Sequence, residues 1–482
     1  MKFFRKAIVL GIVAVLAGFL YWFFEVKKKK EKEEVKRQEA LLFGETEKRV
    51  VKISLKEKGK DEILLEWRRN EPVETEAGEE KPGDDEEGDW FVIAPVRTGG
   101  DNMTIDTMVK SMFQASTDEV VWESLEKQAE YGLDDPDFSL RFYYEGEDRL
   151  QGIDLGRETL DRKKYFARVV GEDRIYTITS NFLDVVKKSL FDLRDKKIAP
   201  YDKDDIVGIT ALTGLDLILL EKEGDDWYIL PDRIKASTAR VDIYTGNLRW
   251  QSFVEVVEEK GSDYTKYGLD NPRMIVTFKL ADDSGFIFVV GNAVQEGDAQ
   301  FFYATRSSDN MIFQIKGETV QKLIPNEFYL RERSILDFEQ DLVNYVAFSK
   351  GTESYTFEKR EGDEWELAAV RNVEGGEEFV GQMLERGYNV DNVVRGIATA
   401  EYEDREPIKR GEPGYQETGI GSPVYEVVLR FEDGRTPITV SLTEKEEETG
   451  KLYLTPDGGE TVYYTSGYFV TNFPETAQEL FE

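Results

Sequence analysis

Cysteine and histidine are both absent from the 482 residues of this chain. The absence of cysteine excludes disulfide bonds, thiol catalysis, cysteine-ligated zinc and iron–sulfur clusters. The absence of histidine excludes Ser-His-Asp triads, zinc sites that need imidazole, and acid–base catalysis by His. The sequence also lacks a GxSxG elbow and a P-loop lysine motif, so ATP hydrolysis would require another subunit. An enzyme built from this chain would depend on Asp, Glu, Ser, Lys or Tyr.

Acidic residues strongly outnumber basic ones, 97 against 63, for a net charge of -34. Residues 1–40 carry ten basic and five acidic residues, so the rest of the chain carries -39. Such a body repels phosphate backbones, and we therefore expect no nucleic-acid partner. The charge is most simply a source of solubility and self-repulsion; a basic partner surface or divalent cations are the functional alternatives. The length predicts two to four domains, and the 40% of apolar residues suffice for hydrophobic cores.

One long apolar run lies near the amino terminus; it begins at Ala7 and ends at Phe24. As a helix it is nearly long enough to cross a bilayer core of about 30 Å. Basic residues flank it on both sides, at positions 2, 5 and 6 and at positions 27–30. Because the run ends in bulky aromatic residues and not in a small-residue cleavage site, it predicts an uncleaved single-pass anchor.

Two features of the flanking charge favour opposite orientations of this anchor. Residues 27–37 hold seven basic and three acidic residues, which by the positive-inside rule places the body in the cytoplasm. A short basic tail ahead of an apolar run is, however, the usual start of an exported, anchored protein. We expect the body to be extracytoplasmic.

Three markers recur along the chain in a fixed order. The first is a tryptophan phrase, with Trp90, Trp227 and Trp365 spaced by 137 and 138 residues. The second is Tyr-Gly-Leu-Asp-x-Pro, at 131–136 and 267–272, with a worn third form at 418–423. The third is a Leu-Arg phrase, at 193–198 and 330–335. The marker residues, which we interpret as structural, are Trp90, Pro95, Tyr131, Gly132, Pro136, Arg194, Trp227, Pro231, Tyr267, Gly268, Pro272, Arg331, Trp365, Gly419 and Pro423.

The markers divide the chain into a membrane anchor (1–26), a charged tether (27–49) and three repeats (50–198, 199–340 and a degenerate 341–482). Each repeat reads as three short strands, a helix, four further strands and a closing helix. In the first repeat the helix carries an apolar stripe at Ile105, Met108, Val109, Met112 and Phe113. The predicted fold class is α+β: an N-terminal transmembrane helix followed by three tandem, mainly antiparallel sheet-plus-helix units.

The glycine and proline of the second marker predict a turn that ends a helix and starts a strand, because glycine adopts the left-handed conformation and proline stops the helix. A ligand-binding loop is the alternative. The tryptophan is expected to anchor the core of each repeat in preference to stacking on a sugar. The first repeat also has an acidic insertion at 69–89, interpreted as a solvated extension, with a calcium loop as the alternative. We expect no catalytic, cofactor-binding or metal-binding residue.

Together, the anchor and the three markers resemble the bacterial domain-of-unknown-function 4340 family, most strongly over residues 50–340. The resemblance implies a membrane-anchored companion of ABC transporters, encoded beside permease and auxiliary components of the gliding-motility type, and therefore a place in the bacterial inner membrane. It implies partners among ABC permease and auxiliary subunits, but it identifies no small-molecule ligand and provides no catalytic or ligand residue to carry over; we expect no cofactor. The leading hypothesis is a non-catalytic accessory or scaffold subunit. The alternative is a carboxylate-dependent enzyme that acts on cell-envelope glycans, or a glycan-binding protein.

Overall fold

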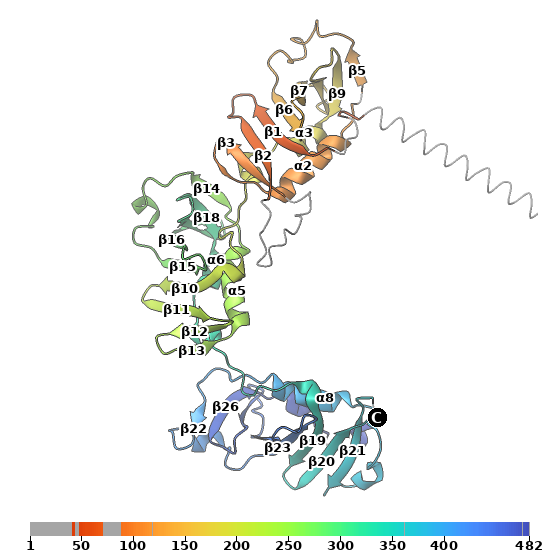
Figure 1. Ribbon diagram of the computed structural model, residues 1–482, viewed down its shortest axis with the longest axis vertical. Helices are drawn as coiled ribbons and strands as arrows, with labels where there is room; N and C mark the ends of the chain where they lie inside the picture. The colour runs from red at the N-terminus through yellow and green to blue at the C-terminus, as the bar shows by residue number, and fades with distance from the viewer. Residues whose placement is uncertain are drawn as a thin grey trace, which may run out of the picture. The chain divides into compact units, whose positions relative to one another are not determined.

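The computed structural model describes residues 41–43, 48–70, 88–117, 119–360, 362–474 and 476–481. These residues form three antiparallel sheets, each accompanied by a few short helices (Figure 1). The α+β class with three sheet units is thus confirmed. The predicted anchor, the tether up to residue 40 and residues 71–87 of the acidic insertion lie outside the described residues. In the described part of the chain, no helix combines the length and apolar character that crossing a membrane requires.

The chain divides into two compact units. The first comprises the residues up to Glu221 together with Asp242–Pro325, and the second comprises Lys222–Val241 and Asn326–Glu482. The first unit therefore contains the whole first sheet and most of the second. The second unit contains the whole third sheet together with two short strands, β12 and β13.

The first sheet has the order β4-β3-β2-β1-β6-β7-β8-β9-β5. Strand β6 shows the alternation that this arrangement requires, since every second side chain from Phe138 to Tyr144 is buried. Helix α2 packs on this core through Ile105, Met108 and Met112, the centre of the predicted stripe. The elements are β1 (Val50–Glu57), β2 (Ile63–Arg69), β3 (Gly88–Ala94), β4 (Thr98–Gly99), α2 (Asn102–Gln114), β5 (Glu119–Trp122), β6 (Phe138–Tyr144), β7 (Gln151–Glu158), β8 (Lys164–Val169), β9 (Ile175–Thr179), α3 (Ser180–Val186) and α4 (Leu190–Leu193).

The second sheet, β13-β12-β11-β10-β15-β16-β17-β18-β14, repeats the first strand for strand. Its helix α5 follows the short strand β13 as α2 follows β4. The elements are β10 (Ile206–Thr213), β11 (Asp216–Glu223), β12 (Asp226–Leu230), β13 (Ile234–Ala236), α5 (Thr238–Arg249), β14 (Glu255–Glu258), β15 (Met274–Leu280), β16 (Gly285–Glu296), β17 (Ala299–Arg306), β18 (Ile312–Lys316), α6 (Gly317–Leu323) and α7 (Glu327–Leu330).

The third sheet, β21-β20-β19-β23-β24-β25-β26-β22, keeps the same order, and an isolated bridge between Glu366 and Met383 takes the place of β4 and β13. Helix α8 takes the place of α2 and buries Val390, Val393, Val394 and Ile397. The elements are β19 (Val343–Lys350), β20 (Glu353–Lys359), β21 (Trp365–Arg371), α8 (Tyr388–Ala398), β22 (Ile408–Lys409), β23 (Tyr425–Phe431), β24 (Ile438–Leu442), β25 (Lys451–Thr455) and β26 (Thr461–Ser466).

Candidate functional site

The three marker tryptophans occupy the same place in successive sheets, in β3, β12 and β21, and each is at most 3% exposed. The indole Nε1 of Trp90 donates to Asp106 Oδ1 on α2 at 2.9 Å. The indole of Trp365 likewise donates to Asp391 on α8 at 2.8 Å. In the first and third repeats the tryptophan thus links sheet and helix, with its nitrogen satisfied by a helical carboxylate.

The Tyr-Gly-Leu turns also share one geometry. Their glycines Gly132, Gly268 and Gly419 have φ of 74°, 68° and 74°, a left-handed conformation that glycine adopts without strain. A Cβ added at Gly291 would lie 2.2 Å from the carbonyl oxygen of Tyr267, so the turn rests directly on strand β16. Pro136, Pro272 and Pro423 stand two residues before β6, β15 and β23, while Pro95 and Pro231 follow cis peptide bonds at the ends of β3 and β12.

The Leu-Arg phrase forms an extended linker between the first and second sheets, within the first unit. On one side the amide of Asp195 donates to the carbonyl of Gly99 at 2.8 Å. On the other side the amide of Ile198 donates to Gln251 at 3.0 Å, and the carbonyl of Lys196 accepts from Phe253 at 3.0 Å. The linker therefore adds backbone hydrogen bonds to both repeats that it joins.

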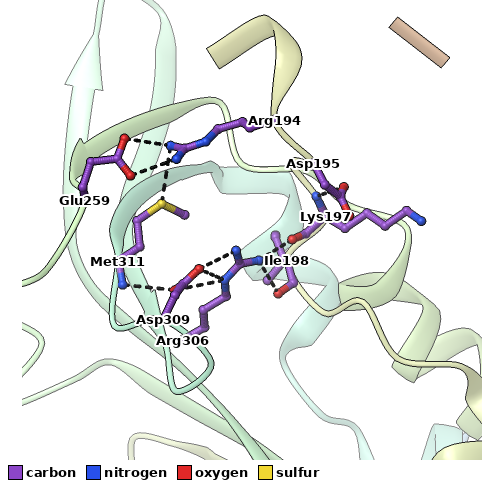
Figure 2. A network of polar contacts seen from close by, with 8 residues as sticks. All are labelled: Arg194, Asp195, Lys197, Ile198, Glu259, Arg306, Asp309 and Met311. Atoms are coloured by element: carbon purple, nitrogen blue, oxygen red, sulfur yellow. Dashed lines mark hydrogen bonds and ion pairs between the residues drawn. The ribbon is translucent and has the colours of Figure 1, made fainter. Parts of the chain in front are cut away.

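Two buried arginines fix this linker (Figure 2). Arg194 is 3% exposed; its Nη1 and Nη2 reach both oxygens of Glu259 at 3.1 and 2.8 Å, and Nη1 lies 3.7 Å from the sulfur of Met311. Arg306, at the end of β17, donates back to the carbonyls of Lys197 and Ile198. The junction combines a bidentate ion pair with hydrogen bonds from a guanidinium to linker carbonyls, a geometry specific to arginine.

Arg306 is itself neutralised by Asp309, which accepts from Nη2 at 2.7 Å and also accepts from the amide of Met311. Each buried guanidinium at this junction thus has its own carboxylate. Such pairing is what allows charged groups to be held away from water.

The second Leu-Arg phrase repeats this arrangement within the second unit. The amide of Glu332 donates to Lys235 at 2.8 Å, the amide of Ile335 donates to Ala400 at 2.9 Å, and the carbonyl of Arg333 accepts from Tyr402 at 3.0 Å. The side chain of Arg331 pairs with Glu327 and Glu406, and Glu401 pairs with Arg240 and Arg333. The two linkers thus use the same backbone pairing and the same arginine–glutamate chemistry.

The segment ahead of the first repeat docks at the corresponding place. The amide of Leu42 donates to Ala115 at 2.9 Å, and Leu41 bridges to Ser116, as Lys197 bridges to Ser252. Sequence reasoning missed this docking segment because Gln38 stands where the other linkers have arginine. The signal that remained was a leucine, Leu42, at the position of Ile198.

Residues 90–254 and again 235–413 match a family model described as "Domain of unknown function (DUF4340)". The two matches overlap at 235–254 and together cover residues 90–413, well over half of the chain. This chain belongs to the DUF4340 family. A comparison with curated proteins gave no match. The two successive matches to the family model agree with the repeated strand order of the sheets.

In this DUF4340 chain the outer face of the first sheet carries a buried charge cluster. Asp154 on β7 is 1% exposed and accepts hydrogen bonds from Ser139 at 2.7 Å, from Arg168 at 2.6 Å and from Arg141. Arg168 also donates to Gln128, in the segment that covers this face, at 2.9 Å. Burial raises the pKa of Asp154, but the hydrogen bonds from Arg168, Ser139 and Arg141 outweigh it and hold that pKa below its ordinary value.

The second unit contains a polar cavity of about 510 Å³ between α8, the end of β26 and the residues that follow it. Glu401 lines it while pairing with Arg240 and Arg333, and Tyr468 at its rim is 78% exposed. Across the described ranges, no group of three or more acidic residues is arranged to hold a metal ion. The lining residues are Asn392, Arg395, Gly396, Thr399, Ala400, Glu401, Glu403, Thr465, Ser466, Tyr468, Phe469 and Asn472.

Proposed function

We propose that this DUF4340 protein is a membrane-anchored, non-catalytic accessory or scaffold subunit of an ABC-type transport complex in the bacterial inner membrane. The anchor at residues 7–24 contacts the permease, and the three sheets contact neighbouring subunits on the extracytoplasmic side. The observation that carries the proposal is the pair of arginine-fixed linkers. They join copies of one sheet through contacts that hold the chain in place: at the first junction Arg194 pairs with Glu259, and Arg306 pairs with Asp309 and donates to the carbonyl of Ile198.

Tandem repetition suits this role because repeated units multiply surface area and rarely duplicate a single active site. The shared strand order keeps the backbone of each sheet alike, while the side chains on the outer faces differ from repeat to repeat. Different faces on one scaffold allow several partners to be held by a single chain.

A glycan-acting or glycan-binding protein of the cell envelope is the second candidate. The observation that favours it is the polar cavity of about 510 Å³ in the second unit, where Glu401 and Glu403 lie near the exposed ring of Tyr468. Carboxylates, amides and aromatic rings are groups through which proteins bind sugars. Against hydrolysis stands the pairing of Glu401 with Arg240 and Arg333, which already engages that carboxylate.

Affinity purification of the full-length protein from detergent-solubilised membranes tests the proposal. Recovery of a permease and an ATPase in fixed ratio to this chain is the expected result. A chain that purifies alone and hydrolyses envelope glycans would overturn it. A reporter that fluoresces only in the cytoplasm, fused after Glu482, tests the orientation: dark cells with intact fusion protein on a blot are expected, and bright cells contradict an extracytoplasmic body.

A further inference from the structure

The outer face of the second sheet carries a row of apolar side chains that crosses four strands. The register places Leu217 opposite Leu212, Leu212 opposite Ile275, and Ile275 opposite Val289. Side chains directly opposite one another in neighbouring strands lie on the same face of a sheet. Their chain neighbours Ile218, Ala211, Val276 and Phe288 point the other way and are buried.

Two of the four side chains in this row are exposed to solvent. Leu217 is 55% exposed and Leu212 is 36% exposed, and Ile287, on the same face in the next row, is 43% exposed. Leu215, at the tip of the hairpin between β10 and β11, is 100% exposed. Ile275 and Val289 are partly buried, and Val289 packs against the cluster of Tyr267 and Leu269. Scattered single apolar residues are ordinary on a surface, whereas a contiguous row marks an interaction site.

The same row in the other two repeats shows that the fold does not require it to be apolar. In the first sheet the register aligns Lys56, Ser139 and Asp154. In the third sheet it aligns Ser349, Glu426 and Ser441. All three sheets have the same strand order, so an apolar outer row is a property of the second repeat and not of the architecture.

We propose that this row, with Leu215 at its end, is a docking surface for an amphipathic helix of a partner protein, with basic residues flanking the helix's apolar stripe. Three spacings between strands make the row about 14 Å long, which matches nearly three turns of a helix. Successive strands lie about 4.8 Å apart and successive helical turns about 5.4 Å, so leucines one turn apart can meet successive strands.

Charge selects the basic partner. The chain as a whole carries -34. A neighbouring row on the same face has no net charge, because Glu221 and Lys279 lie opposite Gly208 on its two sides. A second molecule of this chain and an anionic bilayer are both repelled by the overall charge, whereas lysine and arginine beside an apolar stripe are attracted. The inference holds whether or not the partner is a transporter.

The test uses the full-length protein in detergent and a synthetic helical peptide of about 14 residues. The peptide has leucine at i, i+3, i+4 and i+7 and lysine at the other positions, and a scrambled peptide of the same composition lacks the apolar face. The variant combines Leu212→Thr, Leu215→Ser and Leu217→Thr, because threonine keeps the β-propensity of the strands. The matched control combines Met103→Ser and Leu160→Ser, two apolar residues that are 79% and 107% exposed in the first repeat.

Binding is measured in about 0.3 M salt, so that unspecific attraction to the acidic body is screened. We expect the leucine–lysine peptide to bind the unaltered protein and the control alike, and the triple variant at least about 30-fold more weakly, as loss of three buried leucines requires. Equal binding by the triple variant, or equal binding of the scrambled peptide, overturns the proposal. It is also overturned if the unaltered protein ignores the peptide but binds phosphatidylcholine vesicles or self-associates through the row. Circular dichroism and urea midpoints establish that all proteins are folded.

Discussion

Glu259→Gln is expected to loosen the linker between the first and second repeats while leaving both sheets folded. Glu259 supplies both oxygens that bind the guanidinium of Arg194. Glutamine offers one acceptor and no charge, and its amide group would face the arginine's donors. Because Arg194 is 3% exposed, water cannot replace the lost oxygen without opening the junction.

The size of the effect follows from the burial of the two partners. Removing one member of a fully buried ion pair costs about 3–5 kcal/mol. Glu259 is 43% exposed, so solvent already screens part of the attraction. Hydrogen bonds to a charged group contribute about 1.5–3 kcal/mol. We therefore expect a loss of about 2 kcal/mol, which corresponds to an opening equilibrium about 30-fold more favourable.

Amide hydrogen exchange measures this opening directly, because the linker amides of Asp195 and Ile198 and the facing amide of Phe253 are all hydrogen-bonded across the junction. Their exchange is expected to accelerate by about 30-fold in the variant. Amides in the middle of strand β6 or β15 should keep their rates. The assay thus separates opening of the linker from unfolding of a sheet.

Glu123→Gln is the matched control. Glu123 follows edge strand β5 as Glu259 follows edge strand β14, but it pairs with Arg174, and the two side chains are 74% and 54% exposed. An exposed pair contributes less than about 1 kcal/mol, so exchange should barely change. If both variants accelerate exchange equally, or if neither does, the reasoning from burial is wrong.

Three further variants test single contacts. Asp154→Asn should destabilise the first sheet by about 2 kcal/mol at neutral pH. Because folding lowers the pKa of Asp154, the stabilisation by its carboxylate is complete above the unfolded pKa of about 3.9 and is lost as the pH falls through the folded pKa. The urea midpoints of the variant and the unaltered protein should therefore converge in acid. Gly291→Ala places a Cβ 2.2 Å from a carbonyl oxygen and should lower the free energy of unfolding in urea by about 3 kcal/mol. The loss should be well above that of Gly297→Ala, whose Cβ meets no atom within 4 Å and which adds only the strain of a φ of 61°. Asp391→Ala leaves the indole nitrogen of Trp365 buried without its acceptor and should cost about 1–2 kcal/mol, with no change expected in unfolding of the first unit.

Sequence reasoning predicted the sheets because their signals are local and repeated. Alternation in segments such as Phe138–Tyr144 requires one buried face, and the stripe from Ile105 to Phe113 requires a helix on that face. The constant distance between tryptophans then showed that one arrangement recurs. The short edge strands were missed, because four residues such as Glu119–Trp122 are too few to reveal a period.

Contacts between distant residues could not be predicted from one sequence. Arg194 and Glu259 are 65 positions apart, and nothing in the local sequence around either residue indicates that they pair. Likewise Asp154 reads as one of many acidic residues until the register brings Ser139 and Arg168 beside it. Burial and partnership are set by the tertiary fold, whereas the sequence pattern reports only period and composition.

The three docking segments show what the arginine of the Leu-Arg phrase is for. The backbone pairing of Leu42 with Ala115 repeats that of Ile198 with Gln251, although Gln38 replaces the arginine in the first case. In that repeat Glu123, the counterpart of Glu259, pairs with Arg174 of its own sheet. By sequence spacing, Gln38 is thus the counterpart of this arginine ahead of the first repeat, whereas the arginine itself is present in both Leu-Arg phrases. It occurs where one repeat is followed by another, which makes it a determinant of the junction.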